Sequence, residues 1–152
     1  MNLGEIAGQI CKVILPIPEQ TYPGNPNSNV AICTLSSIDL LKQIASSDVM
    51  EKIVIAGRLL SENKGIDSMV RAVIKNPGLD TIIVCGKEVS GHRTGHALFC
   101  LHEFGTDHNN RIINSVSPDP ILSVSKDEIR QFQNQVKLVN KIGQTKLEQI
   151  IQ

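Results

Sequence analysis

The sequence predicts an α/β domain of the Rossmann-like, three-layer type with a mainly parallel sheet. Several short apolar runs are continuous rather than alternating, which is typical of strands covered on both faces. Between these runs lie stretches whose apolar residues recur at three- and four-residue steps, as in amphipathic helices. Strands that alternate with helices favour parallel pairing through crossover connections. We expect the 152 residues to form a single domain.

The elements are predicted in this order. The first stretch of the chain is rich in helix and strand breakers from Pro16 to Pro26, and residues 1–22 are expected to form an N-terminal arm. The four apolar runs expected as strands are Val30–Leu35, Ile53–Gly57, Thr81–Gly86 and Arg111–Asn114. The three amphipathic stretches expected as helices are Ile66–Asn76, Gly95–Phe104 and Ser125–Val139. Ser125 and Glu128 have the capping-box spacing that begins a helix, and residues 140–152 are expected as a C-terminal tail.

The composition excludes some classes of partner. Fifteen basic and fifteen acidic residues cancel, and aromatic residues make up only 3% of the chain. Nucleic-acid binding is therefore not expected, since it needs a clustered positive field and stacking platforms. No run approaches the roughly 20 apolar residues of a membrane span, and the first residues lack a signal-peptide cleavage site. We expect a cytoplasmic chain.

The four cysteines do not suggest a metal site or a disulfide framework. Cys11, Cys33, Cys85 and Cys100 are far apart in the sequence, and none forms a CxxC pair. Cys33 and Cys85 lie in predicted strands, where thiols behave as small buried hydrophobic groups.

Three glycine-bearing polar turns are the candidate functional region. They cover residues 57–65, 86–95 and 114–122. In a parallel α/β sheet, ligands bind beyond the carboxyl ends of the strands, where such turns lie. His92, in the second turn, could offer an imidazole nitrogen to a metal or a proton. A solvated histidine on a surface turn is the alternative, and the residues alone leave both open.

Other chemistries receive weaker support from these turns. His92 and His96 could share a zinc ion on a helix, but Gly95 lies between them and no standard zinc spacing follows. The 57–65 turn could bind a nucleotide phosphate, although it lacks a dinucleotide or P-loop pattern and Glu62 would repel phosphate. Asp119, between two prolines, is interpreted as part of a rigid turn.

The same turns resemble a known family, the A subunit of tetrahydromethanopterin S-methyltransferase, which carries the corrinoid in a complex of methanogenic archaea. The most specific match is Glu-Val-Ser-Gly-His-Arg-Thr-Gly at residues 88–95. Further matches follow in the family's order across about residues 22–140, including Ser-Glu-Asn-Lys-Gly-Ile at 61–66, Leu-His-Glu-Phe-Gly at 101–105 and Phe-Gln-Asn-Gln-Val at 132–136.

The resemblance implies a corrinoid cofactor of the cobalamin type, with His92 as the axial cobalt ligand and the catalytic residue. It implies a methyltransferase component of methanogenesis and one-carbon metabolism that passes a methyl group from methyl-tetrahydromethanopterin by way of cobalt to coenzyme M. Other methyltransferase subunits are the implied partners, through which the chain could associate with a membrane. The residues implied to contact the corrinoid, besides His92, are Thr34, Leu35, Ser36, Ser61, Glu62, Asn63, Gly65, Gly91, Thr94, Gly95 and Pro120.

Some positions differ from the family's pattern. The family's C-terminal membrane helix is not found in these 152 residues, so a shortened form and a soluble paralogue are both open. Arg58-Leu-Leu60 replaces Pro-Cys-Lys, and Asn114–Val124 replaces a glycine-rich loop. A corrinoid carrier without enzymatic activity, or a paralogue with a different methyl acceptor, is therefore the alternative function.

Overall fold

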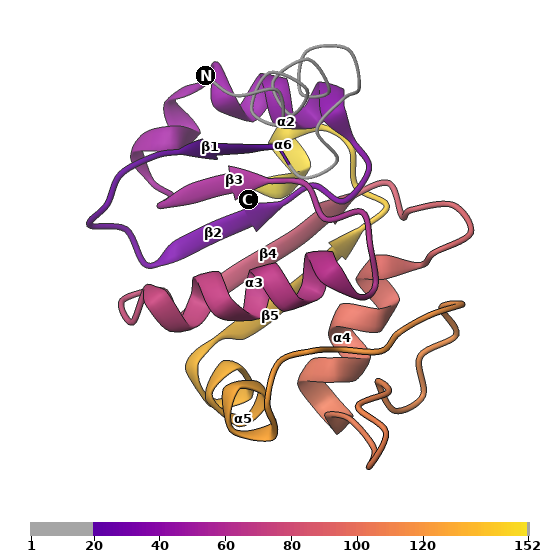
Figure 1. Ribbon diagram of the computed structural model, residues 1–152. Helices are drawn as coiled ribbons and strands as arrows, with labels where there is room; N and C mark the ends of the chain where they lie inside the picture. Colours follow the sequence, from indigo (N-terminus) through magenta and orange to yellow (C-terminus); the bar gives the residue numbers. More distant parts are fainter. Residues whose placement is uncertain (1–19, 152) are drawn as a thin grey trace, which may run out of the picture.

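The structure is a computed structural model that describes residues 20–151 (Figure 1). Its five strands form one sheet in the order β1-β3-β2-β4-β5. These strands are β1 (Thr21–Pro23), β2 (Val30–Cys33), β3 (Ile55–Gly57), β4 (Thr81–Gly86) and β5 (Lys137–Ile142). The last four pair in parallel, whereas β1 is antiparallel to β3 at one edge. The predicted mainly parallel sheet is therefore confirmed.

Helices cover both faces of the sheet, as Figure 1 shows. One face carries α3 (Lys64–Lys75), α4 (Thr94–Phe104) and α5 (Lys126–Gln135), and the other carries α2 (Ile38–Ala45) and α6 (Leu147–Ile150). Alternate residues of β2 enter separate cores: Cys33 packs on the α3 side, and Ile32 packs on the α2 side. A strand buried on both faces must be apolar throughout, which explains its continuous apolar run. The three-layer α/β class is confirmed.

Local signals at the helix ends match the structure. The α3 helix begins after Asn63, whose side-chain oxygen accepts the Lys64 amide at 2.7 Å. The capping box of α5 is confirmed: the Ser125 hydroxyl accepts the Glu128 amide, and the Glu128 carboxylate accepts the Ser125 amide. Both contacts satisfy amides that a helix start leaves without intrahelical partners.

The prediction of a strand at Arg111–Asn114 is wrong. Residues 106–122 form only two isolated bridges, Thr106 with Ile112 and Arg111 with Ile121, and neither belongs to the main sheet. Asn114 has a φ of +65°, in the left-handed region, which ends any extended run there. The segment is a loop that packs Ile112 against the core.

The fourth parallel strand lies where a helix was expected to continue. The predicted helix to Val139 ends at Gln135, and Lys137–Ile142 pair with β4 instead. The Gln135 side-chain amide donates to the carbonyls of Val73, Asn76 and Leu79, at 2.8 to 3.0 Å. This contact holds the end of α5 beside the end of α3, and the Lys137 amide then bonds Asp80, the residue before β4.

Residues 1–19 of the predicted arm lie outside the described residues, whereas Thr21 and Tyr22 belong to β1. The predicted tail contains the end of β5 and α6. Cys33 and Cys85 are buried, as expected, and Cys11 lies outside the described residues. Within residues 20–151, no helix has the length and apolar character that crossing a bilayer requires.

Candidate functional site

The polar turns meet at the carboxyl edge of the sheet, at the point where the chain leaves β2 and β4 toward opposite faces. After β2 the chain passes to α2 on one face, and after β4 it passes to α4 on the opposite face. This divergence makes the loops after β2 and β4 a topological switch point, the usual ligand position in such sheets. The two loops are tied together, because the Ser36 hydroxyl donates to the Lys87 carbonyl at 2.8 Å.

His92 lies in an exposed turn between β4 and α4. The turn is built by Gly91, with a φ of +78°, and by Arg93, with a φ of +48°. The His92 amide donates to the Val89 carbonyl at 3.1 Å, which closes the turn. As a result the imidazole is directed outward, and 52% of the side chain is exposed.

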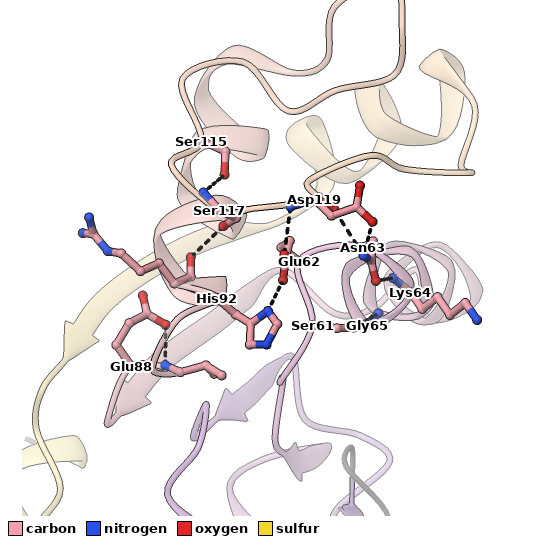
Figure 2. Close-up of polar contacts among 12 residues, drawn as sticks. Ser61, Glu62, Asn63, Lys64, Gly65, Glu88, His92, Ser115, Ser117 and Asp119 are labelled. Carbon is pink, nitrogen blue, oxygen red and sulfur yellow. Dashed lines mark hydrogen bonds and ion pairs between the residues drawn. The ribbon is translucent and has the colours of Figure 1, made fainter.

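Glu62, from the loop between β3 and α3, holds one side of this imidazole (Figure 2). Its Oε2 lies 3.0 Å from Nδ1 of His92, and its Oε1 accepts the Asp119 amide at 3.1 Å. Glu62 is only 2% exposed, so both carboxylate oxygens need such partners. When the ring is neutral, a carboxylate acceptor at Nδ1 favours a proton there, which leaves the lone pair on Nε2. The ring nitrogen on the far side from Glu62 is thus the one that can bind a metal or a proton.

A third loop, residues 115–120, is held beside the Glu62–His92 pair by hydrogen bonds. The Asn63 side-chain amide donates to the Asp119 carbonyl at 3.1 Å and to its carboxylate at 3.3 Å. From the same loop, the Ser117 hydroxyl donates to the Arg93 carbonyl at 3.4 Å. Sequence reasoning assigned Asp119 to a rigid turn and missed this contact, because no local signal relates residues that are 56 positions apart.

The other predicted contact residues differ in how much of them solvent can reach. Gly91 is exposed like His92, and Ser36, Ser61 and Asn63 are half-buried. The buried members are Thr34, Leu35, Glu62, Gly65, Thr94, Gly95 and Pro120. The Thr94 hydroxyl is buried without a hydrogen-bond partner. Contacts join Glu62 with His92 and Ser61 with Gly65, while Thr34 and Ser36 bond neighbouring backbone instead.

Gly95 has a packing role at the start of α4. A Cβ added there would lie 2.9 Å from the Glu88 carboxylate and from the Ile142 side chain, and 3.0 Å from Leu35. Glu88 could not easily yield, because it accepts the amides of Gly95 and His96, each at 2.9 Å. The absence of a side chain at Gly95 therefore lets α4 begin close to the sheet.

These contacts argue against a dinucleotide-type phosphate site. Anions bind at helix starts because amides are free there. At α4, the Glu88 carboxylate already occupies two of these amides. At α3, the Ser61 hydroxyl accepts the Gly65 amide at 2.7 Å. A phosphate at α4 would also meet the negative charge of Glu88.

The zinc alternative gains no support either. His92 precedes α4, whereas His96 lies within it, with both ring nitrogens 3.8 Å from the Cys100 sulfur. Burial raises the pKa of the Cys100 thiol, which opposes the thiolate form that metals bind. In the part of the chain that the structure describes, no group of three histidine, cysteine or acidic side chains could hold a metal ion.

A cavity of about 390 Å³ runs along the side of α3. Of the predicted contact residues it includes Gly65, and its described lining does not extend to His92. The cavity and the His92–Glu62 pair are thus two separate features of the same sheet face.

Comparison with known proteins supports the family resemblance. The family model described as the A subunit of tetrahydromethanopterin S-methyltransferase matches residues 15–152. The A subunit of the methyltransferase Mtx of Methanosarcina barkeri is 36% identical over 138 residues, which cover 90% of this chain and 66% of that protein. The first A subunit of tetrahydromethanopterin S-methyltransferase of Methanothermobacter thermautotrophicus is 39% identical over 121 residues, which cover 78% of this chain and 49% of that protein.

The chain therefore spans between half and two thirds of the length of these two relatives. The match includes every loop of the site described above, since those loops lie within residues 15–152. A family model that covers this much of the chain identifies it: the chain belongs to the family of the A subunit of tetrahydromethanopterin S-methyltransferase.

Proposed function

We propose that this chain is the corrinoid-binding component of a methyltransferase, and that Nε2 of His92 is an axial ligand of the cobalt. The observation that carries the proposal is the Glu62–His92 pair, in which a buried carboxylate engages Nδ1 at 3.0 Å and the ring remains half exposed. A metal-binding histidine usually donates a hydrogen bond from the N–H of its other ring nitrogen to such a carboxylate. When bound, the corrinoid would supply the cobalt centre that accepts and releases the methyl group.

The residues of the turn fit a large flat ligand. A Cβ at Gly91 would meet nothing within 4 Å, so the space beside the turn is open. Ser36, Ser61 and Asn63 lie on neighbouring loops of the same edge and are half-buried, so their polar groups could contact the ligand's amide side chains. Thr94 follows His92 by two residues, and its buried hydroxyl has no hydrogen-bond partner.

In this proposal His92 acts as a ligand that is gained and released. Only the neutral imidazole can bind cobalt, and Glu62 keeps the proton on Nδ1 while Nε2 binds. The methyl group would come from methyl-tetrahydromethanopterin and go to the thiol of coenzyme M, with other subunits of the complex supplying those substrate sites. A ligand that binds one methylation state better than the other shifts the population between them.

Reconstitution tests the ligand assignment. Purified protein incubated with hydroxocobalamin should retain the corrinoid through gel filtration. Its visible absorption spectrum should be that of a corrinoid with an imidazole as axial ligand. The His92→Ala variant should lose that feature, and added imidazole should restore it. Glu103→Gln, an exposed change on α4, is the matched control and should leave the spectrum unchanged. The assignment fails if His92→Ala and wild type have the same spectrum.

A carrier without turnover is the second candidate. This candidate is favoured by the hydrogen bonds that join Asp119 to Asn63 and Glu62. They hold the 115–120 loop at the carboxyl edge of the sheet, where substrates would approach. Methyl transfer from methyl-tetrahydromethanopterin to coenzyme M, measured with the partner subunits present, separates the two. Corrinoid binding with no transfer would support the carrier.

A further inference from the structure

Four of the five large apolar side chains that are exposed within residues 20–151 lie in one segment of the chain. They form what we call the 104–121 patch, and their exposed fractions are 36 to 59%: Phe104, Ile113, Val116 and Ile121. A single exposed apolar residue is ordinary on a protein surface, whereas a cluster of them marks a site of interaction. In Figure 1 the segment after α4, drawn in orange, lies at the margin of the molecule, and no helix or strand of the described part lies outside it.

Backbone contacts bring these side chains to one surface. Arg111 and Ile121 are opposite each other in an antiparallel bridge, so their side chains point to the same side. Ile112 is buried and its two neighbours are exposed, so Arg111 and Ile113 leave the chain on the side away from the core. The Ile113 amide donates to the Gly105 carbonyl at 3.1 Å, which places Ile113 beside the end of α4.

The patch is continuous with the loop that supports His92. Val116 belongs to the 115–120 loop. The Asp119 amide of that loop donates to the Glu62 carboxylate at 3.1 Å, and the same carboxylate engages Nδ1 of His92 (Figure 2). A protein bound to the patch would therefore lie at the carboxyl edge of the sheet, close to the exposed imidazole.

One charge lies within this surface and has no counterpart in the chain. Arg111 is exposed, and its guanidinium forms no ion pair within residues 20–151. The nearby charges of Asp107 and Lys126 are opposite in sign, and the Lys126 ammonium donates to the Asp107 carbonyl. A complementary surface would be apolar and would place a carboxylate opposite Arg111.

The patch is too small for a permanent assembly. A stable dimer buries about 800 Å² on each partner, which four partly exposed side chains cannot supply. Small interfaces are typical of proteins that bind and release each other. A component that takes a methyl group from one protein site and gives it to another must release each partner in turn. The size of the patch therefore fits such a partner better than a second copy of this chain.

We propose that the 104–121 patch is the docking surface for another subunit of the methyltransferase, one that exchanges the methyl group with the His92 site. The contacting surface of that subunit is apolar and carries a carboxylate that pairs with Arg111. This inference rests on the proposed function, because it assigns the partner of the same site.

Binding of purified partner subunits to the immobilised chain tests the patch. The subunits that supply the pterin and coenzyme M sites are used separately, and biolayer interferometry measures the affinity. At least one of them should bind the wild type, and Ile121→Asp and Val116→Asp should each weaken that binding at least tenfold. Ile151→Asp is the matched control, because Ile151 is 54% exposed but follows α6 on the opposite face of the sheet. Its affinity should stay within twofold of wild type.

The salt dependence of association tests the charge. The association rate of the wild type should fall as salt is raised, and Arg111→Gln should reduce this dependence severalfold. Lys42→Gln, an exposed change on α2, is the control and should leave it unchanged. Equal salt dependence in Arg111→Gln and Lys42→Gln would overturn the assignment of a carboxylate to the partner.

The cobalamin spectrum separates this inference from the proposed function. Every patch variant should retain hydroxocobalamin with the wild-type spectrum and should unfold at the wild-type urea concentration, because the altered side chains are exposed. A spectrum that is unaffected by His92→Ala refutes the ligand assignment, whereas the patch is judged by binding alone. Equal affinities of Ile121→Asp and Ile151→Asp, or no binding of any partner subunit to the wild type, would overturn the docking surface. Dimers of this chain in sedimentation that Ile121→Asp abolishes would also overturn it, since a second copy would then be the occupant.

Discussion

The carboxylate of Glu62 lies 3.0 Å from Nδ1 of His92, although 30 residues separate the two in the sequence. One partner is 2% exposed and the other is 52% exposed, so a fixed interior group orients a side chain at the surface. The buried carboxylate is itself held by the Asp119 amide, so its position does not depend on His92 alone.

Replacing Glu62 by glutamine should weaken corrinoid binding about 10- to 100-fold, the usual cost of losing a carboxylate that supports a metal-binding histidine. A titration of the protein with hydroxocobalamin, followed by absorbance, measures this effect. Glutamine keeps the volume of the side chain and can still accept the Asp119 amide, so the fold should be retained.

A second readout needs no corrinoid. Nitrogen-15 NMR of the neutral imidazole should report a proton mainly on Nδ1 in the wild type and mainly on Nε2 in Glu62→Gln, because a glutamine whose oxygen accepts the Asp119 amide turns its NH2 group toward Nδ1. Glu103→Gln is the control for both measurements, since Glu103 is an exposed residue of α4. Unchanged affinity and an unchanged tautomer in Glu62→Gln would mean that the carboxylate does not orient the ring.

Gly95→Ala should destabilise the fold. The added Cβ would lie within 3.0 Å of Glu88, Ile142 and Leu35, and the carboxylate is pinned by two amides. Overpacking of this kind costs about 1–3 kcal/mol in the free energy of unfolding, which urea denaturation measures. Gly78→Ala is the matched control, because a Cβ there meets nothing within 4 Å. Equal stability of the two variants would contradict the close approach of α4 to the sheet.

Glu128 should stabilise the fold only while it is ionised. Its pKa is lowered, first by the hydrogen bond from the Ser125 amide, below the ordinary value of 4.5. A carboxyl group with a depressed folded-state pKa stabilises the fold above its unfolded pKa, and this contribution is lost as pH falls through the folded value. The difference in unfolding free energy between wild type and Glu128→Gln should therefore be constant above about pH 6 and decrease below pH 4.5. A difference that grows on acidification would contradict the capping box.

Cys85 should resist alkylation while the protein is folded. Burial raises the pKa of its thiol from the ordinary value of 9.0 to about 12, so almost no reactive thiolate exists at about pH 8. Iodoacetamide labelling, mapped by mass spectrometry, should be more than about 100-fold slower in buffer than in concentrated urea, by the order of the pKa difference. Since this pKa is raised on folding, its contribution to stability should decline as pH increases from 9.0 to about 12. Rapid labelling in buffer would show that the β4 core opens readily.

Much of the framework could be predicted from local patterns. Continuous apolar runs identified β2, β3 and β4, and the apolar steps of Ile66–Asn76 identified α3 to within two residues. Such patterns are local because burial on one face or two imposes a spacing on the sequence itself. Since the carboxyl ends of parallel strands share one edge, the position of the polar turns followed from the same patterns.

The predictions from sequence were wrong where strand pairing in the sheet decides whether a segment forms a helix, a strand or a loop. The apolar steps Ile129, Phe132, Val136 and Val139 fit a helix throughout, yet the Gln135 contacts with the end of α3 place the next residues beside β4, where strand pairing satisfies their amides. In the opposite sense, Arg111–Asn114 has two adjacent isoleucines as a strand might, but among the described residues it pairs with none of the five strands and forms only isolated bridges. A short stretch of sequence does not show which segments will find hydrogen-bond partners in the sheet, because those partners are distant in the sequence.

The sequence by itself determined the α/β class, the exposed glycine-flanked turn that carries His92 and the family to which the chain belongs. The tertiary structure decided that Glu62 meets Nδ1 of that histidine and that Asp119 holds Glu62 in place. The physical reason is that a spacing pattern reports only which side of an element is buried. The partner of a buried carboxylate depends on which loops the sheet order brings together.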